Sequence, residues 1–237
     1  MGAGVLMLRE GFEASLIVGI VLAFLNKTGR RDGFLAVWLG AVAAIAISIA
    51  VAIGLFAVGA ELEGTAEYVW EGTAMLLAAG LLTWMIFWMR RQARSIKKDL
   101  ESQVRSALAA GSSLALATVA FVGVLREGVE TSLFFFSSVE SSKGATSIVG
   151  SIVGLSLAVA LGYAFYKGSS RLDLHRFFSI TSGLLLLFAG WLLARGLEEY
   201  AEAAILPENE LILWGAFAAL AAPTLYLFFR PARPRPA

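Results

Sequence analysis

The 237-residue sequence contains no cysteine and a single histidine. The first absence excludes disulfides, thiolate metal sites and cysteine nucleophiles, and the second disfavours a histidine-rich metal centre or a Ser-His-Asp triad. Charged residues make up only 16% of the chain, against ~25% in soluble domains. A net charge of +1 provides no field that would attract nucleic acid. Chemistry in this chain must therefore use carboxylates, arginines, hydroxyls or the backbone.

Apolar residues, in contrast, make up 58% of the chain, and the mean hydropathy is +0.76. Seven apolar stretches have the ~20 residues that a helix needs to cross ~30 Å of hydrocarbon. They are Gly4–Leu25, Phe34–Gly59, Tyr68–Met89, Leu114–Ser138, Ala145–Tyr166, Phe178–Leu197 and Leu211–Phe229. The alternation typical of membrane β-strands is absent. The sequence therefore predicts an all-α polytopic membrane protein with seven transmembrane helices.

Basic and acidic residues alternate between the connections of these stretches. Lysines and arginines gather after the first, third, fifth and seventh stretches, whereas glutamates dominate the other connections. The positive-inside rule then places the N-terminus outside and the C-terminus in the cytoplasm, in a multi-pass protein of the cytoplasmic (inner) membrane. The longest basic connection, Arg90 to Gly111, is predicted to be helical and to stop at Gly111. The Pro/Arg tail at 230–237 is predicted to be disordered.

One charged motif occurs twice within the apolar stretches. Arg9-Glu10-Gly11-Phe12-Glu13 lies in the first stretch, and Arg126-Glu127-Gly128-Val129-Glu130 lies in the fourth. A charge at the centre of a membrane helix costs ~2.5–3.5 kcal/mol if left unpaired. The i,i+3 spacing places both glutamates of each motif on one helix face, and the i,i+4 spacing lets each arginine pair with the second glutamate. These charges are expected to meet one another, water or an ion.

The two motif stretches run in opposite directions through the predicted membrane. This favours a 3+3 inverted repeat with a site near mid-membrane, a recurrent transporter design. Residues 1–229 then form one seven-helix domain, with repeat one at about 4–111, repeat two at about 112–200 and an extra helix at about 211–229. Glycines such as Gly150 and Gly154 are interpreted as packing residues within the chain rather than as a dimer contact.

Four motif glutamates and two arginines leave two negative charges in excess. That charge suits a hard cation with oxygen ligands, and the lack of cysteine and histidine near the motif argues against selectivity for soft metals. The alternative interpretation is a salt-bridge cluster that fastens two helices. Its duplication in oppositely oriented helices favours function, because ionisable groups inside membranes are usually functional.

At these residues the sequence resembles the oxidase-dependent iron permease family, which includes fungal high-affinity iron permeases and bacterial EfeU-type permeases. The family hallmark is an Arg-Glu-Gly-x-Glu motif in the first and fourth of seven helices. The segment from Leu82 to Arg90, the pair Glu71-Gly72, and Arg171-Leu172 with Phe177-Phe178 resemble the family as well.

The resemblance implies import of iron, as Fe³⁺ or Fe²⁺, with no organic cofactor and no enzymatic activity. It implies that Glu10, Glu13, Glu127 and Glu130 handle the iron and that Arg9 and Arg126 are essential neighbours. It also implies an extracytoplasmic partner protein for iron redox chemistry. Membrane lipid is the other expected partner, and nucleic acid is not one.

Further glutamates lie on the predicted outer side, at matching positions of the two halves. A vestibule that concentrates cations is predicted there as a second rank of metal-handling residues: Glu67, Glu71, Glu198, Glu199 and Glu202. A plain solvated rim is the alternative, and it is the preferred interpretation of Glu61, Glu63, Glu208 and Glu210. Arg195 is expected to neutralise part of this rim.

Three rival functions stay open at this point. Oxygen ligands suit Mn²⁺ and Mg²⁺ as well as iron, so another divalent-cation or proton-coupled transporter could use the same glutamates. A membrane di-iron enzyme is disfavoured, because such sites typically use Glu-x-x-His pairs and this chain has none. A passive assembly subunit that only holds redox partners is the last alternative.

Overall fold

The structure, a computed structural model, describes residues 2–92, 96–109, 111–142, 145–167, 174–207 and 209–229. Within these ranges the chain forms eight α-helices, one 3₁₀ turn and no β-strand. The helices are α1 (Gly2–Lys27), η1 (Arg31–Gly33), α2 (Phe34–Glu61), α3 (Thr65–Gln92), α4 (Ile96–Ala109), α5 (Ser113–Ser142), α6 (Ala145–Tyr166), α7 (Leu174–Glu202) and α8 (Glu210–Phe229). The all-helical prediction is confirmed, and each of the seven apolar stretches lies in a long helix.

The basic connection contains the predicted helix, α4, which packs against both α1 and α5. Gly111 follows it with a φ of +64° and donates its N–H to the carbonyl oxygen of Leu108 at 3.0 Å. Glycine accepts this left-handed conformation without strain, so it ends the helix as the sequence predicts. The predicted disordered tail, 230–237, lies outside the described residues.

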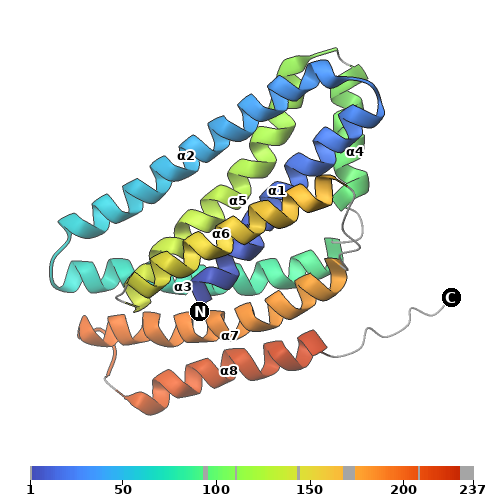
Figure 1. Cartoon of the computed structure of the whole chain (residues 1–237). Helices are drawn as coiled ribbons and strands as arrows, with labels where there is room; N and C mark the ends of the chain where they lie inside the picture. The colour runs from blue at the N-terminus through green and yellow to red at the C-terminus, as the bar shows by residue number, and fades with distance from the viewer. Residues whose placement is uncertain are drawn as a thin grey trace.

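The long helices alternate in direction and pack around the two motif helices, α1 and α5 (Figure 1). α1 and α5 contact each other; α6 packs on the other side of α1, and α2 on the other side of α5. α3 and α7 pair with each other and contact α5 and α1, respectively, and α8 packs on α7. Exchange of α1–α3 with α5–α7 therefore turns the α1–α6 contact into α5–α2 and the α3–α5 contact into α7–α1, and it leaves the α1–α5 and α3–α7 contacts unchanged.

Small residues set the closest helix contacts, as they do in membrane proteins generally. Added Cβ atoms on Gly72 of α3 and Gly196 of α7 would each lie about 3 Å from the other glycine's carbonyl oxygen, at 2.9 and 3.0 Å. On α6, Gly154 faces the backbone of Gly4 on α1 so closely that a Cβ has no room. Gly150 also lies beside Gly4, so both α6 glycines serve packing within the chain.

The same close packing involves the glycine of each motif. A Cβ on Gly11 would lie 2.9 Å from the side chains of Ala158 and Leu155 on α6. A Cβ on Gly128 would overlap the side chain of Ser48 on α2. Each motif glycine thus allows its helix to approach the flanking helix, and the positions of the adjacent charged side chains follow from that approach.

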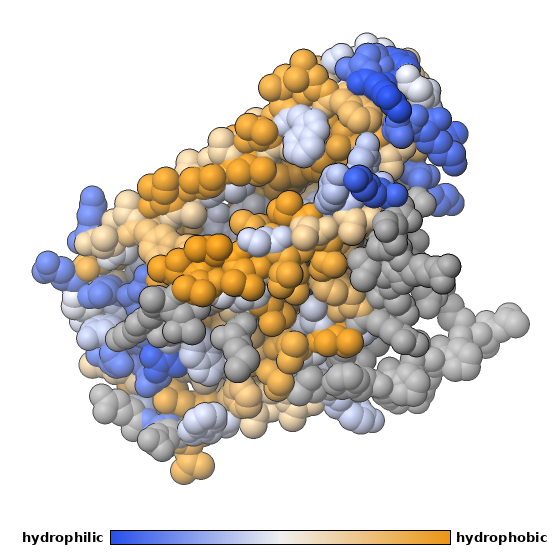
Figure 2. Space-filling model, viewed as in Figure 1, coloured by the Kyte–Doolittle hydropathy of each residue, from blue (hydrophilic) through white to orange (hydrophobic). Residues whose placement is uncertain are grey.

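Apolar side chains cover the flanks of the molecule, and polar ones gather at its two ends (Figure 2). On α2, large residues such as Trp38, Val42, Ile45 and Ile49 point outward and are about half exposed or more. In water such a continuous apolar face would be strongly unfavourable, whereas in lipid it is the expected surface. These are the features of a multi-pass membrane protein.

Among the described residues, four helical stretches are long and apolar enough to cross a membrane by length and composition alone. They are Arg31–Glu61, Thr65–Met89, Ile148–Tyr166 and Phe177–Glu202. The helices α1 and α5 are also long, but each carries the three charges of its motif. In α8 the apolar stretch is shorter, Leu213–Thr224. The number of seven spans therefore stays a prediction.

Candidate functional site

The α1 motif is buried in the centre of the molecule. Arg9 is fully buried, at 0% exposure, and Glu10 and Glu13 are buried beside it. Arg9 Nη1 lies 3.1 Å from Glu10 Oε1, and Arg9 Nε lies 3.1 Å from Glu13 Oε1. The i,i+4 pair between Arg9 and Glu13 is the one that the helical spacing predicts. The single guanidinium thus compensates both carboxylates of its own helix.

The α5 motif repeats this arrangement with one difference. Arg126 Nε lies 3.1 Å from Glu130 Oε1 and 3.8 Å from Glu127 Oε1, and both carboxylates are buried. The Arg126 side chain, however, is 38% exposed, and its guanidinium stacks on the ring of Trp88 at 4.4 Å. Cation–π contact stabilises a guanidinium without saturating its N–H donors. Arg126 is therefore held less completely than Arg9.

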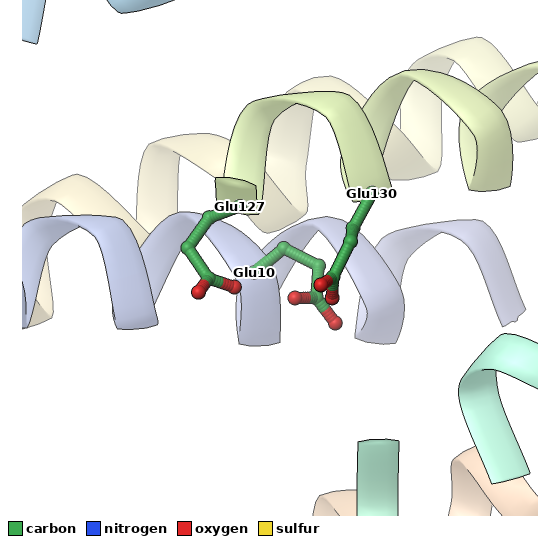
Figure 3. Close-up of side chains that lie close together, drawn as sticks. All are labelled: Glu10, Glu127 and Glu130. Carbon is green, nitrogen blue, oxygen red and sulfur yellow. The ribbon is translucent and has the colours of Figure 1, made fainter. Parts of the chain in front are cut away.

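Contact between α1 and α5 brings carboxylates of the two motifs together. One ligand oxygen each from Glu10, Glu127 and Glu130 lies within 4.8 Å of the others, and all three residues are buried. Figure 3 shows the side chains of Glu127 and Glu130 pointing from α5 towards α1, where their carboxylates lie near that of Glu10. We call these residues the motif triad. Glu13 stands beside it, engaged by Arg9, and does not belong to the three.

The triad has the donor chemistry of a cation site. Within the described part of the chain, no hydrogen-bond donor reaches Glu10 Oε2, Glu127 Oε2 or Glu130 Oε2, although all are buried. Two oxygens on one small divalent ion lie at most ~4–4.4 Å apart, because each metal–oxygen bond is ~2.0–2.2 Å. Three oxygens spaced evenly around one ion lie at most ~3.6 Å apart, so each of the three carboxylate oxygens would have to move by up to about 0.7 Å for one ion to contact them all.

A second carboxylate group lies at the end of the molecule where α3 begins and α5 and α7 end. The Glu71 carboxyl group hydrogen-bonds that of Glu140 and lies within electrostatic range of Glu199 and Glu67. We call these four residues the outer acidic group, after the side of the membrane on which the sequence predicts them. Glu198 instead forms an ion pair with Arg195, as expected for a neutralised rim, and Glu202 is exposed.

The lower-ranked rim residues do not extend this group in the described chain. Glu61 and Glu63 are exposed at the junction of α2 and α3. Glu208 and the side chain of Glu210 lie outside the described part of the chain. The structure thus brings together three of the five vestibule candidates, Glu67, Glu71 and Glu199.

Four residues near these sites were not among the sequence candidates. The sequence places Glu140 in a loop, because the predicted fourth stretch ends at Ser138, whereas α5 continues to Ser142. The other three come from α3. The Trp88 ring contacts the guanidinium of Arg126, and the sulfurs of Met85 and Met89 accept hydrogen bonds from the guanidinium of Arg9. The i,i+4 spacing of the two methionines, in a segment that resembles the iron permeases, was the available signal.

The comparisons with known proteins decide the family. A model of the iron permease FTR1 family matches residues 1–221. The chain belongs to the iron permease FTR1 family. This is a family of transporters, and the iron ion is its transported substrate.

Relatives of this FTR1 family member support the same family assignment. The ferrous iron permease EfeU of Escherichia coli O6:K15:H31 (strain 536 / UPEC) is 34% identical over 223 residues, which cover 93% of this chain and 81% of the relative. The EfeU of Yersinia pestis is 34% identical over 202 residues, covering 84% and 72%. No solved structure matches the chain significantly.

Proposed function

We propose that this FTR1 family member imports iron across the cytoplasmic membrane and that the motif triad is its mid-membrane binding site. The observation that carries this proposal is the convergence of Glu10, Glu127 and Glu130 from two helices, with oxygens within 4.8 Å. Buried carboxylates that face one another repel, so a bound cation is the natural compensation. Glu13 completes the set of iron-handling glutamates through its contact with Arg9.

In this mechanism the outer acidic group attracts the cation first, because its carboxylates lie at the predicted outer end. Glu198 and Glu202 complete the predicted vestibule around it. The cation then passes to the motif triad. Arg126 and Arg9 neutralise the carboxylates before the cation arrives, and their contacts with the glutamates loosen as the positive charge of the metal replaces that of a guanidinium. The partial exposure of Arg126 makes it the first to yield.

For the fold, we propose seven spans with the N-terminus outside, and two inverted halves related by the exchange of α1–α3 with α5–α7. The matching contacts α1–α6 and α5–α2 support this relation. The glutamates of the outer acidic group and the basic residues Lys27, Arg30 and Arg31 lie at opposite ends of the helices, as the positive-inside rule requires. An extracytoplasmic redox partner that supplies the iron completes the proposal.

The absence of cysteine makes the orientation simple to test. Glu63 and Thr28 are both exposed and lie at opposite ends of the molecule. We expect a membrane-impermeant maleimide to label Glu63→Cys in intact cells and to label Thr28→Cys only after the membrane is permeabilised. The reverse pattern would show that the chain is inserted with its N-terminus in the cytoplasm.

The function itself is tested by radio-iron uptake into proteoliposomes that contain the purified chain. We expect uptake above that of empty liposomes, with iron supplied once as Fe²⁺, as in the names of the relatives, and once as Fe³⁺. Excess Mn²⁺ as competitor separates an iron permease from a general divalent-cation transporter. If neither Fe²⁺ nor Fe³⁺ were taken up, even after the extracytoplasmic partner was added, the result would contradict iron transport by this chain. The paired motifs would then be a structural cluster of ion pairs.

A further inference from the structure

Two methionine sulfurs from α3 face the guanidinium of Arg9. Arg9 Nη2 lies 3.1 Å from Met89 Sδ, and Arg9 Nη1 lies 3.8 Å from Met85 Sδ. Met85 is fully buried and Met89 is nearly so. Their i,i+4 spacing places both sulfurs on one face of α3. This contact joins a third helix to the site formed by α1 and α5.

The guanidinium of Arg9 therefore lies in a space that is shaped for a cation. Glu10 Oε1 and Glu13 Oε1 border it on α1, each 3.1 Å from a guanidinium nitrogen. The two sulfurs border it on α3. Two carboxylates and two thioethers thus surround one positive charge. A metal ion that replaced the guanidinium would meet two oxygen and two sulfur ligands.

A role limited to fixing Arg9 explains the sulfurs poorly. Thioether sulfur is a weak hydrogen-bond acceptor, whereas a carbonyl or hydroxyl oxygen would satisfy a buried guanidinium better. Within the described residues, Arg9 Nε has no hydrogen-bond partner of good geometry, although it is buried. Soft thioethers instead suit metals that are softer than Mn²⁺ and Mg²⁺. Methionine is an established ligand of haem iron, so the Fe–thioether bond has precedent.

We propose that Met85 and Met89 are ligands that select Fe²⁺ over Mn²⁺ and Mg²⁺. This inference rests on the proposed function, in which iron passes the motif glutamates. Glu10 belongs both to the motif triad and to the group around Arg9. Glu10 thus connects the triad with the space that the two sulfurs border, and a cation that moves from the triad into the place of the Arg9 guanidinium meets both sulfurs. Oxygen ligands alone accept all three metals, and the sulfurs add the preference for the softer one.

This reverses one inference from the sequence. The lack of cysteine and histidine near the motifs argued against selectivity for soft metals, and the single thioether of Met7, three residues before Glu10, was interpreted as packing. The fold supplies such ligands from α3, 76 and 80 residues away from Arg9. The four methionines after Met1 all lie in the same buried core: Met7, Met75, Met85 and Met89.

The test compares Fe²⁺ uptake into oxygen-free proteoliposomes by the wild type and the Met85→Leu/Met89→Leu variant, with increasing Mn²⁺. Leucine conserves volume and apolarity but removes the sulfur, so the fold is kept. We expect Fe²⁺ uptake to persist, while the Mn²⁺ concentration for half-inhibition falls about tenfold or more. Unchanged Mn²⁺ inhibition would overturn the role of the sulfurs.

Met75→Leu is the matched control, because Met75 is a buried methionine of the same helix and core. It precedes Met85 by about 15 Å along the helix axis, so its sulfur cannot replace those at Arg9. We expect its Mn²⁺ inhibition to equal that of the wild type. Absence of Fe²⁺ uptake by the wild type would instead contradict the proposed function. Failure of the proposed function can therefore be told apart from failure of the proposed role of the sulfurs.

X-ray absorption at the iron edge tests the ligands without relying on transport or on a variant that folds. We expect sulfur in the first coordination shell of Fe²⁺ bound to the detergent-purified wild type, and its loss in the Met85→Leu/Met89→Leu variant. A shell of oxygen alone in the wild type would overturn the inference.

Discussion

Glu10→Gln and Glu127→Gln are each expected to reduce iron uptake about a hundredfold while the protein remains folded. Each substitution removes one negative charge from the motif triad and retains the shape of the side chain. Removing one partner of a buried charge pair costs ~2–5 kcal/mol, and ~3 kcal/mol corresponds to about a hundredfold in binding. Radio-iron uptake into proteoliposomes measures the loss, and size-exclusion chromatography and circular dichroism check the fold.

Glu63→Gln is the matched control for these variants. Glu63 is exposed between α2 and α3, and its removal changes the net charge of the chain by the same amount. We expect near wild-type uptake. If both triad variants retained uptake, the paired motifs would not be the iron site, whatever the family of the chain.

Arg9→Gln is expected to lower the melting temperature far more than Arg126→Gln does. Arg9 is fully buried and compensates Glu10 and Glu13, so its loss leaves two buried carboxylates without a counter-charge. Breaking a buried pair in this way costs ~3–5 kcal/mol, or about 6–20 °C for a chain of this size. Loss of Arg126 also removes the counter-charge of two buried carboxylates, but its side chain is 38% exposed, so water can enter its place and we expect a smaller cost than for Arg9.

Thermal unfolding of the purified variants in detergent checks this difference. The double variant Arg9→Gln/Glu13→Gln is the informative control, because it removes a carboxylate together with the guanidinium. We expect it to recover part of the lost stability, since deleting both partners of a buried pair costs less than deleting one. Equal destabilisation by the two single arginine variants would contradict the different roles inferred for Arg9 and Arg126.

Much of the helical fold was predictable because its determinants are local. Runs of ~20 apolar residues specify the long helices, and Gly111 specifies the end of α4. The pairing of Arg9 with Glu13, and of Arg126 with Glu130, follows from helical spacing alone. The duplication of the motif predicted that carboxylates of α1 and α5 would meet, and Glu10, Glu127 and Glu130 do so.

The details of the site were not predictable, because they depend on contacts between helices that no local sequence pattern specifies. Which three of the four motif glutamates converge is set by the register of α1 against α5, and Glu13 lies outside the three. The contact of Arg9 with Met85 and Met89 depends on where α3 crosses α1. Glu140 joins Glu71 only because α5 continues past Ser138, beyond the predicted end of the stretch.

The most direct test of an iron site at the paired motifs is anomalous diffraction at the iron edge from crystals grown with Fe²⁺ under reducing conditions. We expect an iron peak at the motif triad, in contact with carboxylate oxygens from both α1 and α5. An iron peak at the outer acidic group alone, with Arg9 and Arg126 still paired to their glutamates, would contradict a binding site at mid-membrane.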